Sequence, residues 1–369
     1  MKFRFFQVAA LVILGGYFSS CKKDKTEKPP EYEIPTSYNF DNVDYVEATQ
    51  AVNMWVGFTG YLGKSTSRQL SQDTVNYLWN NTNDAFKPDY VANLTYSAEQ
   101  LNDFKGVKLS ALAADPVIIK TFADSMVAIS AYFNTAGGEG VAGKQGNRLF
   151  NHDGFEFNQG VAKGLMGLFQ MKNIFEHLDK SVTADNSTVV PGKGTAMEHE
   201  WDLAFGYVSI PRNYDSSVAY PSTDPNRPLA IGGYFRERAR PINAGGTVFS
   251  AFLKGRAAIG AKDYEARDAA IATIKEFIEK TLAASAHTYL SLAQSQGRER
   301  ISQLHDLSEA YGFTVALKSR SANSKLSAAN YTTLVNSLST SFYTLLTEPG
   351  FTKLAAAAKI YTDTYGKLD

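Results

Sequence analysis

The sequence predicts an all-α protein, a helical bundle with two related helical units and long loops. After residue 42, apolar residues recur mostly at intervals of three and four, and the alternation typical of strands is rare. The segment 155–180 illustrates the pattern, because its apolar side chains fall on one stripe of a helix. Helices are predicted over residues 43–63, 67–81, 115–133, 155–180, 195–210, 249–293, 298–319, 328–346 and 351–365.

Boundary signals agree with this pattern. Residues 97–100 and 195–198 have the form of a capping box, and Pro349-Gly350 separates the last two predicted helices. The glycine-rich segment 137–151 and the proline-containing segment 211–246 cannot be continuous helices and are predicted to be loops.

Composition limits the class of protein. Of 369 residues, 44% are hydrophobic and 20% charged, which is typical of a globular chain. The 37 basic side chains equal the 37 acidic ones, so no overall field is available to hold nucleic acid, which we do not expect as a partner. A single cysteine excludes a disulfide within the chain and a zinc or iron-sulfur site built from paired thiolates.

The N-terminus has the features of a bacterial lipoprotein signal. Lys2 and Arg4 precede a short apolar run, and small residues lead to Cys21. We therefore predict a signal peptide over residues 1–20 and acylation of Cys21. An ordinary cleaved signal with an incidental cysteine is the alternative.

The residues that follow predict how the protein is held at a membrane. Residues 21–36, which begin with the acylated cysteine, are charged and proline-containing and predict a flexible tether, followed by a helical domain over 37–369. The membrane is then a partner through the lipid anchor. The expected location is the Gram-negative cell envelope, at the periplasmic or surface face of the outer membrane.

An internal repeat relates two parts of the chain. Residues 199–207 align without gaps on residues 305–313, with identical histidine, alanine and glycine. This predicts two related helical units, centred on 155–210 and 261–319.

The repeat also contains the candidate metal ligands. Residues three or four apart share a helix face, so His199 can lie beside Asp202 and His305 beside Glu309. An imidazole and a carboxylate on one face form half of a site for iron or another divalent metal.

Two further acids, Glu198 and Glu200, are secondary candidates for the metal site. The alternative interpretation needs no metal, because acids in the first turn of a helix favour its dipole and His199 is then a hydrogen-bonded structural residue. Neither His-Glu-x-x-His nor Gly-x-Ser-x-Gly occurs, so the sequence does not support a zincin or an elbow-type serine hydrolase.

The long loop 211–246 carries Arg236, Arg238 and Arg240 at alternate positions. These arginines are candidates for contact with an anion or a partner. The alternative is an ordered surface loop with a solvated basic end.

Four segments resemble the bacterial lipoprotein family of domain of unknown function 4856: residues 38–43, 163–167, 198–207 and 252–259. A more distant resemblance is to the imelysin-like proteins, helical proteins with two related bundles that are associated with iron uptake. Their Gly-x-His-x-x-Glu signature corresponds here to Met197, His199 and Asp202, so only the histidine is kept. The resemblance implies an imelysin-like bundle and an iron or haem uptake partner.

Three functions follow as hypotheses. The first is a non-enzymatic, lipid-anchored envelope protein associated with iron or haem acquisition through metal or partner binding. The second is a metal-dependent, peptidase-like hydrolase, with Glu200 as general base beside a metal held by His199 and Asp202. The third is a purely structural or interaction lipoprotein, in which the same motif caps and packs a helix.

Overall fold

The computed structural model describes residues 31–368 and confirms an all-α fold. Within these residues the strands are the two of one antiparallel hairpin, β1 (Gly143–Gln145) and β2 (Arg148–Phe150). The α-helices are α1 (Val46–Leu62), α2 (Gln72–Asn80), α3 (Ala98–Asp103), α4 (Leu109–Leu112), α5 (Pro116–Ser130), α6 (Phe157–Leu165), α7 (Lys172–Thr183), α8 (Ala196–Val208), α9 (Ile231–Glu237), α10 (Ala244–Ala261), α11 (Tyr264–Ala293), α12 (Arg300–Ala316), α13 (Ala328–Leu338), α14 (Phe342–Thr347) and α15 (Thr352–Tyr365).

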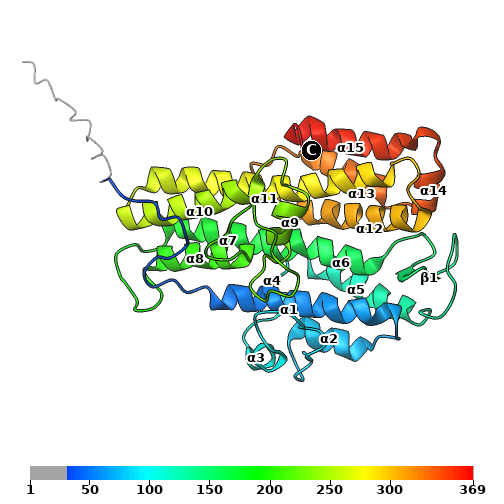
Figure 1. Ribbon diagram of the computed structural model, residues 1–369, viewed down its shortest axis with the longest axis horizontal. Coiled ribbons are helices and arrows are strands. Elements are labelled where there is room, and N and C mark those ends of the chain that lie inside the picture. The colour runs from blue at the N-terminus through cyan, green and yellow to red at the C-terminus, as the bar shows by residue number, and fades with distance from the viewer. Residues whose placement is uncertain (1–30, 369) are drawn as a thin grey trace, which may run out of the picture.

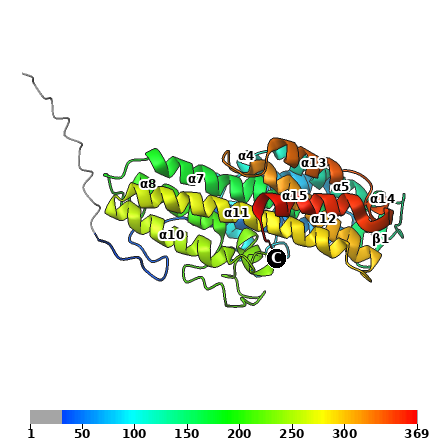
Figure 2. The same cartoon turned by 90° about the horizontal axis from the view of Figure 1, so that it is seen from above.

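The helices form an elongated molecule with a bundle at each end (Figure 1). Helices α7, α8 and α10 pack around the N-terminal half of α11, whereas α5, α6, α12, α13 and α15 lie around its C-terminal half. The view from above shows the same division, with α11 running from one bundle into the other (Figure 2). Helix α1 lies along one side and contacts both α8 and α6.

A second helix continues through both bundles. Helices α6 and α7 are joined by a π-helical segment, η2 (Met166–Met171), so that the predicted helix over 155–180 is continuous. Within η2, a Cβ atom on Gly167 would lie 1.9 Å from the carbonyl oxygen of Ala316. Only glycine therefore allows α12 to end against this segment.

The π segment also positions a polar side chain. Gln170, fully buried, donates to the carbonyl oxygen of Tyr207 at 2.7 Å and accepts from the backbone N–H of Ile231 at 3.0 Å. It thereby satisfies backbone groups that the end of α8 and the start of α9 leave unpaired.

Two segments that the sequence predicts as single helices each form two helices. The segment 249–293 is two helices, because Lys262 adopts a left-handed conformation (φ 58°) and the side chain of Asp263 accepts from the N–H of Ala266 to begin α11. Hydrophobic spacing continues through this break and does not reveal it. The segment 328–346 is likewise divided, into α13 and α14, at Ser339–Ser341.

The boundary signals are confirmed. Both capping boxes are present, at the starts of α3 and α8. Gly350 has φ 68° and lies in the short 3-10 turn that precedes α15.

The two copies of the repeat lie on α8 and α12, and their shared glycines have the same role. A Cβ atom on Gly206 would lie 2.7 Å from the Cβ of Tyr45, and one on Gly312 would lie 2.7 Å from the Cβ of Lys163. Each glycine thus lets its helix approach a neighbour closely, α1 in the first case and α6 in the second.

Candidate functional site

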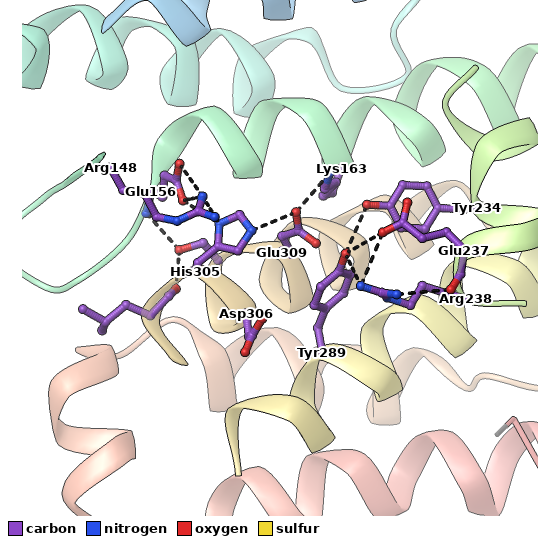
Figure 3. Close-up of polar contacts among 12 residues, drawn as sticks. Arg148, Glu156, Lys163, Tyr234, Glu237, Arg238, Tyr289, His305, Asp306 and Glu309 are labelled. Carbon is purple, nitrogen blue, oxygen red and sulfur yellow. Dashed lines mark hydrogen bonds and ion pairs between the residues drawn. The ribbon is translucent and has the colours of Figure 1, made fainter. Parts of the chain in front are cut away.

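A buried polar cluster in the second bundle brings together part of the predicted site (Figure 3). His305 and Glu309 lie one turn apart on α12, and His305 Nε2 is 3.3 Å from Glu309 Oε1. The other ring nitrogen, Nδ1, is 2.7 Å from an oxygen of Glu156, which immediately precedes α6. The imidazole is therefore held between two carboxylates, one on α12 and one at the residue that precedes α6. We call this set, together with Arg148 and Lys163, the His305 cluster.

The two remaining members of the cluster are cations. Lys163 Nζ lies 3.2 Å from Glu309 Oε1, and Arg148 Nη1 lies 3.3 Å from Glu156 Oε2. Arg148 Nη1 is also 2.6 Å from His305 Nδ1, a contact that only a neutral imidazole could accept. Hydrogen bonds to both carboxylates outweigh the effect of burial, which alone would lower the pKa of His305, and raise it. Nδ1 therefore donates to Glu156, and Arg148 serves as the partner of that carboxylate.

Glu309 is ionised in this cluster. Burial alone would raise its pKa, but the charge of Lys163 and the hydrogen bond from His305 outweigh burial and lower the pKa to about 2. The cluster then places the carboxylates of Glu156 and Glu309 against Arg148, Lys163 and the imidazole of His305. Such an arrangement fixes α6 against α12 by charge as well as by packing.

A second group of polar residues adjoins this cluster along α11 (Figure 3). The hydroxyl of Tyr289 accepts from Arg238 Nη2 at 3.1 Å and lies 3.4 Å from the hydroxyl of Tyr234. The guanidinium of Arg238 also packs 4.6 Å from the centre of the Tyr289 ring and pairs with Glu237 at 3.3 Å. Arg238 is thus drawn into the bundle.

The three predicted arginines consequently separate. Arg236 donates to the carbonyl oxygen of Ser217 at 3.0 Å and lines a cavity in the long loop, whereas Arg240 is exposed. The structure does not bring Arg236, Arg238 and Arg240 to one site.

The matching part of the first bundle is an ion-pair cluster around Asp202. This side chain is fully buried, and its Oδ1 accepts from the hydroxyl of Tyr38 at 2.6 Å and from Arg256 Nε at 3.0 Å. Arg256 also donates from Nη1 to Glu198 at 2.5 Å. We call these four residues the Asp202 cluster. Burial raises the pKa of Asp202 to about 6, against the opposing effects of Arg256 and Tyr38.

His199 and Glu200 lie outside that cluster. The carboxylate of Glu200 is 2.7 Å from His177 Nδ1, and the ring of His177 stacks on Tyr207. His199 Nδ1 is buried and, among residues 31–368, has no hydrogen-bond partner. His199 and Asp202 therefore share a helix but bind no common group.

The predicted metal ligands are thus distributed over three contacts. Glu198 and Asp202 bind Arg256, Glu200 binds His177, and His305 with Glu309 binds Glu156 and Lys163. In the part of the chain that the structure describes, no group of three histidine, cysteine, aspartate or glutamate side chains is arranged to hold a metal ion. Metal binding remains a prediction, and an ion at either cluster would have to displace a cation from a carboxylate.

Sequence reasoning missed the partners Tyr38, Glu156, Lys163 and Arg256, because they lie 54 to 164 residues from the acids or histidine that they contact. One signal was available. The segments 38–43, 163–167 and 252–259, which carry the family resemblance, contain Tyr38, Lys163 and Arg256. Those segments mark the contacts that hold α8 and α12 in place.

The predicted signal peptide and Cys21 lie outside the described residues. Among residues 31–368, none of the helices combines the length and the hydropathy that crossing a membrane requires.

The fold and these clusters define an all-helical protein in which two bundles share long helices and each contains a buried ion-pair cluster. Residues 35–344 match the family model described as Domain of unknown function (DUF4856), and the chain belongs to this family. No curated protein and no solved structure matches the chain.

Proposed function

We propose that the protein is a lipid-anchored protein of the Gram-negative cell envelope that serves iron or haem acquisition by binding a partner, without catalysing a reaction. The lipoprotein-like context of Cys21 and the charged tether support the anchor. The distant resemblance of residues 197–202 to the imelysin signature supports the role in iron acquisition.

One observation favours partner binding over chemistry at the His-acid motif. Asp202 is fully buried, and its Oδ1 is bound by both Tyr38 and Arg256. Oδ1 is used to hold α8 against α10, and Oδ2 is buried without a hydrogen-bond partner among the described residues. A metal ion needs several ligands directed at it, and no group of three candidate ligand side chains within residues 31–368 is arranged to hold one. The motif then acts as a structural element, and recognition falls to the surface of the bundles.

The alternative, a metal-dependent peptidase-like hydrolase, makes a different demand. It needs Glu200 free to activate a water molecule beside the metal. That carboxylate instead lies 2.7 Å from His177 Nδ1, and the contact lowers the pKa of Glu200 despite its partial burial. Glu200 is therefore a poor general base near neutral pH.

The experiment compares growth with iron or haem as the limiting nutrient. We expect a strain lacking the gene to grow more slowly than the parent, and the intact gene to restore growth. A Cys21→Ser gene should restore it poorly, and its product should be absent from the membrane fraction. Equal growth of the deletion strain and its parent on limiting iron and on limiting haem would contradict the role in iron acquisition.

A zinc and iron titration of the purified protein tests the alternative, the metal-dependent hydrolase, separately. His199→Ala is the suitable variant, because His199 is only partly buried and Asp202→Ala would remove one of the two carboxylates that balance the buried charge of Arg256. Equimolar metal binding that is lost in His199→Ala would favour the hydrolase. We expect no equimolar binding to either protein.

A further inference from the structure

The long loop 211–246 borders a cavity whose lining contains arginines and tyrosines. A cavity of about 420 Å³ lies between α1, residues 95–96 and residues 209–229, and its lining includes Tyr45, Tyr96, Arg212 and Arg227. A volume of this size is within the range of small-molecule sites. We call this cavity the loop cleft.

A smaller cavity of about 90 Å³ adjoins the loop cleft at Arg227. It is lined by Tyr214, Tyr220 and Arg236, and the two tyrosine rings are nearly parallel, with centres 6.1 Å apart. Arg227 is common to the two linings, so the cavities form one surface with three arginines and four tyrosines.

No aspartate or glutamate lines either cavity, within the residues that the structure describes. The contrast is a cleft of about 500 Å³ at the junction of the bundles, in which Lys172, Lys275 and Lys318 each pair with an acid. The positive charge around the loop cleft is therefore not neutralised locally, although the whole chain is neutral.

The arginines are held in place by neutral groups. Arg212 Nε donates to the hydroxyl of Tyr45 at 2.9 Å, and its guanidinium lies 5.2 Å from the centre of that ring. Arg227 Nη1 donates to the carbonyl oxygens of Asn93 and Asp224, and Arg236 Nη1 donates to that of Ser217. One edge of each guanidinium is thus fixed while the charge is kept, which reduces the entropy lost when a ligand binds.

The acids of the loop do not compete for these arginines. Asp215 Oδ1 accepts from the N–H and the hydroxyl of Ser217, and Asp224 Oδ1 accepts from the N–H of Asn226. Both carboxylates are occupied within their own turns.

We propose that the loop cleft binds a small organic anion, a polar molecule that carries one or more carboxylate or phosphate groups. Arginine recognises both groups through paired hydrogen bonds. The ring of Tyr96 and the amide of Asn213, which also line the cavity, supply contacts for the uncharged part of the molecule. This inference does not depend on the lipid anchor or on a role in iron acquisition.

The test is calorimetric titration of the purified protein with citrate, with inorganic phosphate, and with glucose as an uncharged control. We expect citrate or phosphate to bind and glucose not to bind, and the anion that binds identifies the charged group of the ligand. Arg212→Gln should weaken binding by about tenfold or more, because a charge-assisted contact is lost.

Arg240→Gln is the matched control, because Arg240 is exposed and lines neither cavity. It should bind like the unaltered protein. Arg212 is exposed too, and its side chain donates to Tyr45 and packs on that ring, so Arg212→Gln should keep the thermal stability of the fold, which calorimetry checks. Absence of binding by both anions at millimolar concentration, or equal losses in Arg212→Gln and Arg240→Gln, would overturn the proposal. The titration does not depend on growth on limiting iron, so the proposal of anion binding can fail while the proposed function stands, and the reverse.

Discussion

The pKa values of one buried acid on α8, Asp202, and one on α12, Glu309, are shifted in opposite directions, although the two helices carry the two copies of one repeat. In the Asp202 cluster, Asp202 and Glu198 share a single cation, Arg256, and burial raises the pKa of Asp202 to about 6. In the His305 cluster, Lys163 and the ring of His305 both face Glu309, and its pKa is lowered to about 2. Asp202 thus shares its cation with a second acid, whereas Glu309 has Lys163 and a hydrogen bond from His305 to offset the cost of burial.

The largest expected effect comes from removing the shared cation. Arg256→Met leaves Asp202 fully buried without its ion pair, and we expect a loss of about 3–5 kcal/mol in the free energy of unfolding. Lys163→Met should cost less, roughly 1–3 kcal/mol, because His305 remains beside Glu309. Urea denaturation at pH 7 measures both. Equal losses would break the comparison, and the double variant Asp202→Asn/Arg256→Met should recover part of the loss.

The next largest effect is expected in the pH dependence of stability, to which Asp202 and Glu309 should contribute with opposite signs. The folded pKa of Asp202, about 6, lies above its ordinary value of 3.8, so between these values the folded state holds a proton that the unfolded chain releases. As pH rises through this window, the contribution of Asp202 to the free energy of unfolding should fall by about 3 kcal/mol. Asp202→Asn should remove this slope, as denaturation at several pH values between 4 and 7 will show.

Glu309 should have the opposite sign. Its folded pKa, about 2, lies below its ordinary value of 4.5, so its stabilisation is present above pH 4.5 and is lost as pH falls toward 2. The free energy of unfolding of the unaltered protein should fall by roughly 3 kcal/mol over that window through Glu309, and Glu309→Gln should abolish this fall. Denaturation at several pH values measures it. A variant that keeps the slope of the unaltered protein would show that Glu309 is not the group responsible.

The smallest expected effect concerns the glycine that the two copies of the repeat share, Gly206 on α8 and Gly312 on α12. Gly206→Ala and Gly312→Ala each place a Cβ atom 2.7 Å from a neighbouring side-chain carbon, and we expect each to cost about 1–3 kcal/mol through overpacking. Gly260→Ala on α10 is the control, since nothing lies within 4 Å of its new Cβ, and it should gain up to about 1 kcal/mol from helix propensity. A loss at only one of the two glycines would limit the correspondence of the repeat to sequence.

The sequence predicts the helices well because their signals are local. Apolar spacing and capping boxes depend on residues a few positions apart, and Thr195 and Ser97 begin helices as expected. The break at Lys262 depends on a backbone conformation that spacing does not encode.

The candidate site was less accessible to such reasoning. Sharing a helix face places His199 near Asp202, but it does not say which way the carboxylate turns. Tyr38 and Arg256, distant in the chain, determine that direction. By the same reasoning, Glu156 binds His305 across 149 residues, while the nearby His152 pairs with Asp153.

The junction between the N-terminal segment and α11 has a geometric consequence. The hydroxyl of Tyr32 donates to Asp263 Oδ2 at 3.0 Å, while Asp263 Oδ1 caps the 30-residue helix α11. The N-terminal segment is thus attached by this hydrogen bond to the start of a helix that runs through both bundles. Its position is therefore set relative to the helix that the two bundles share, and not relative to one bundle alone.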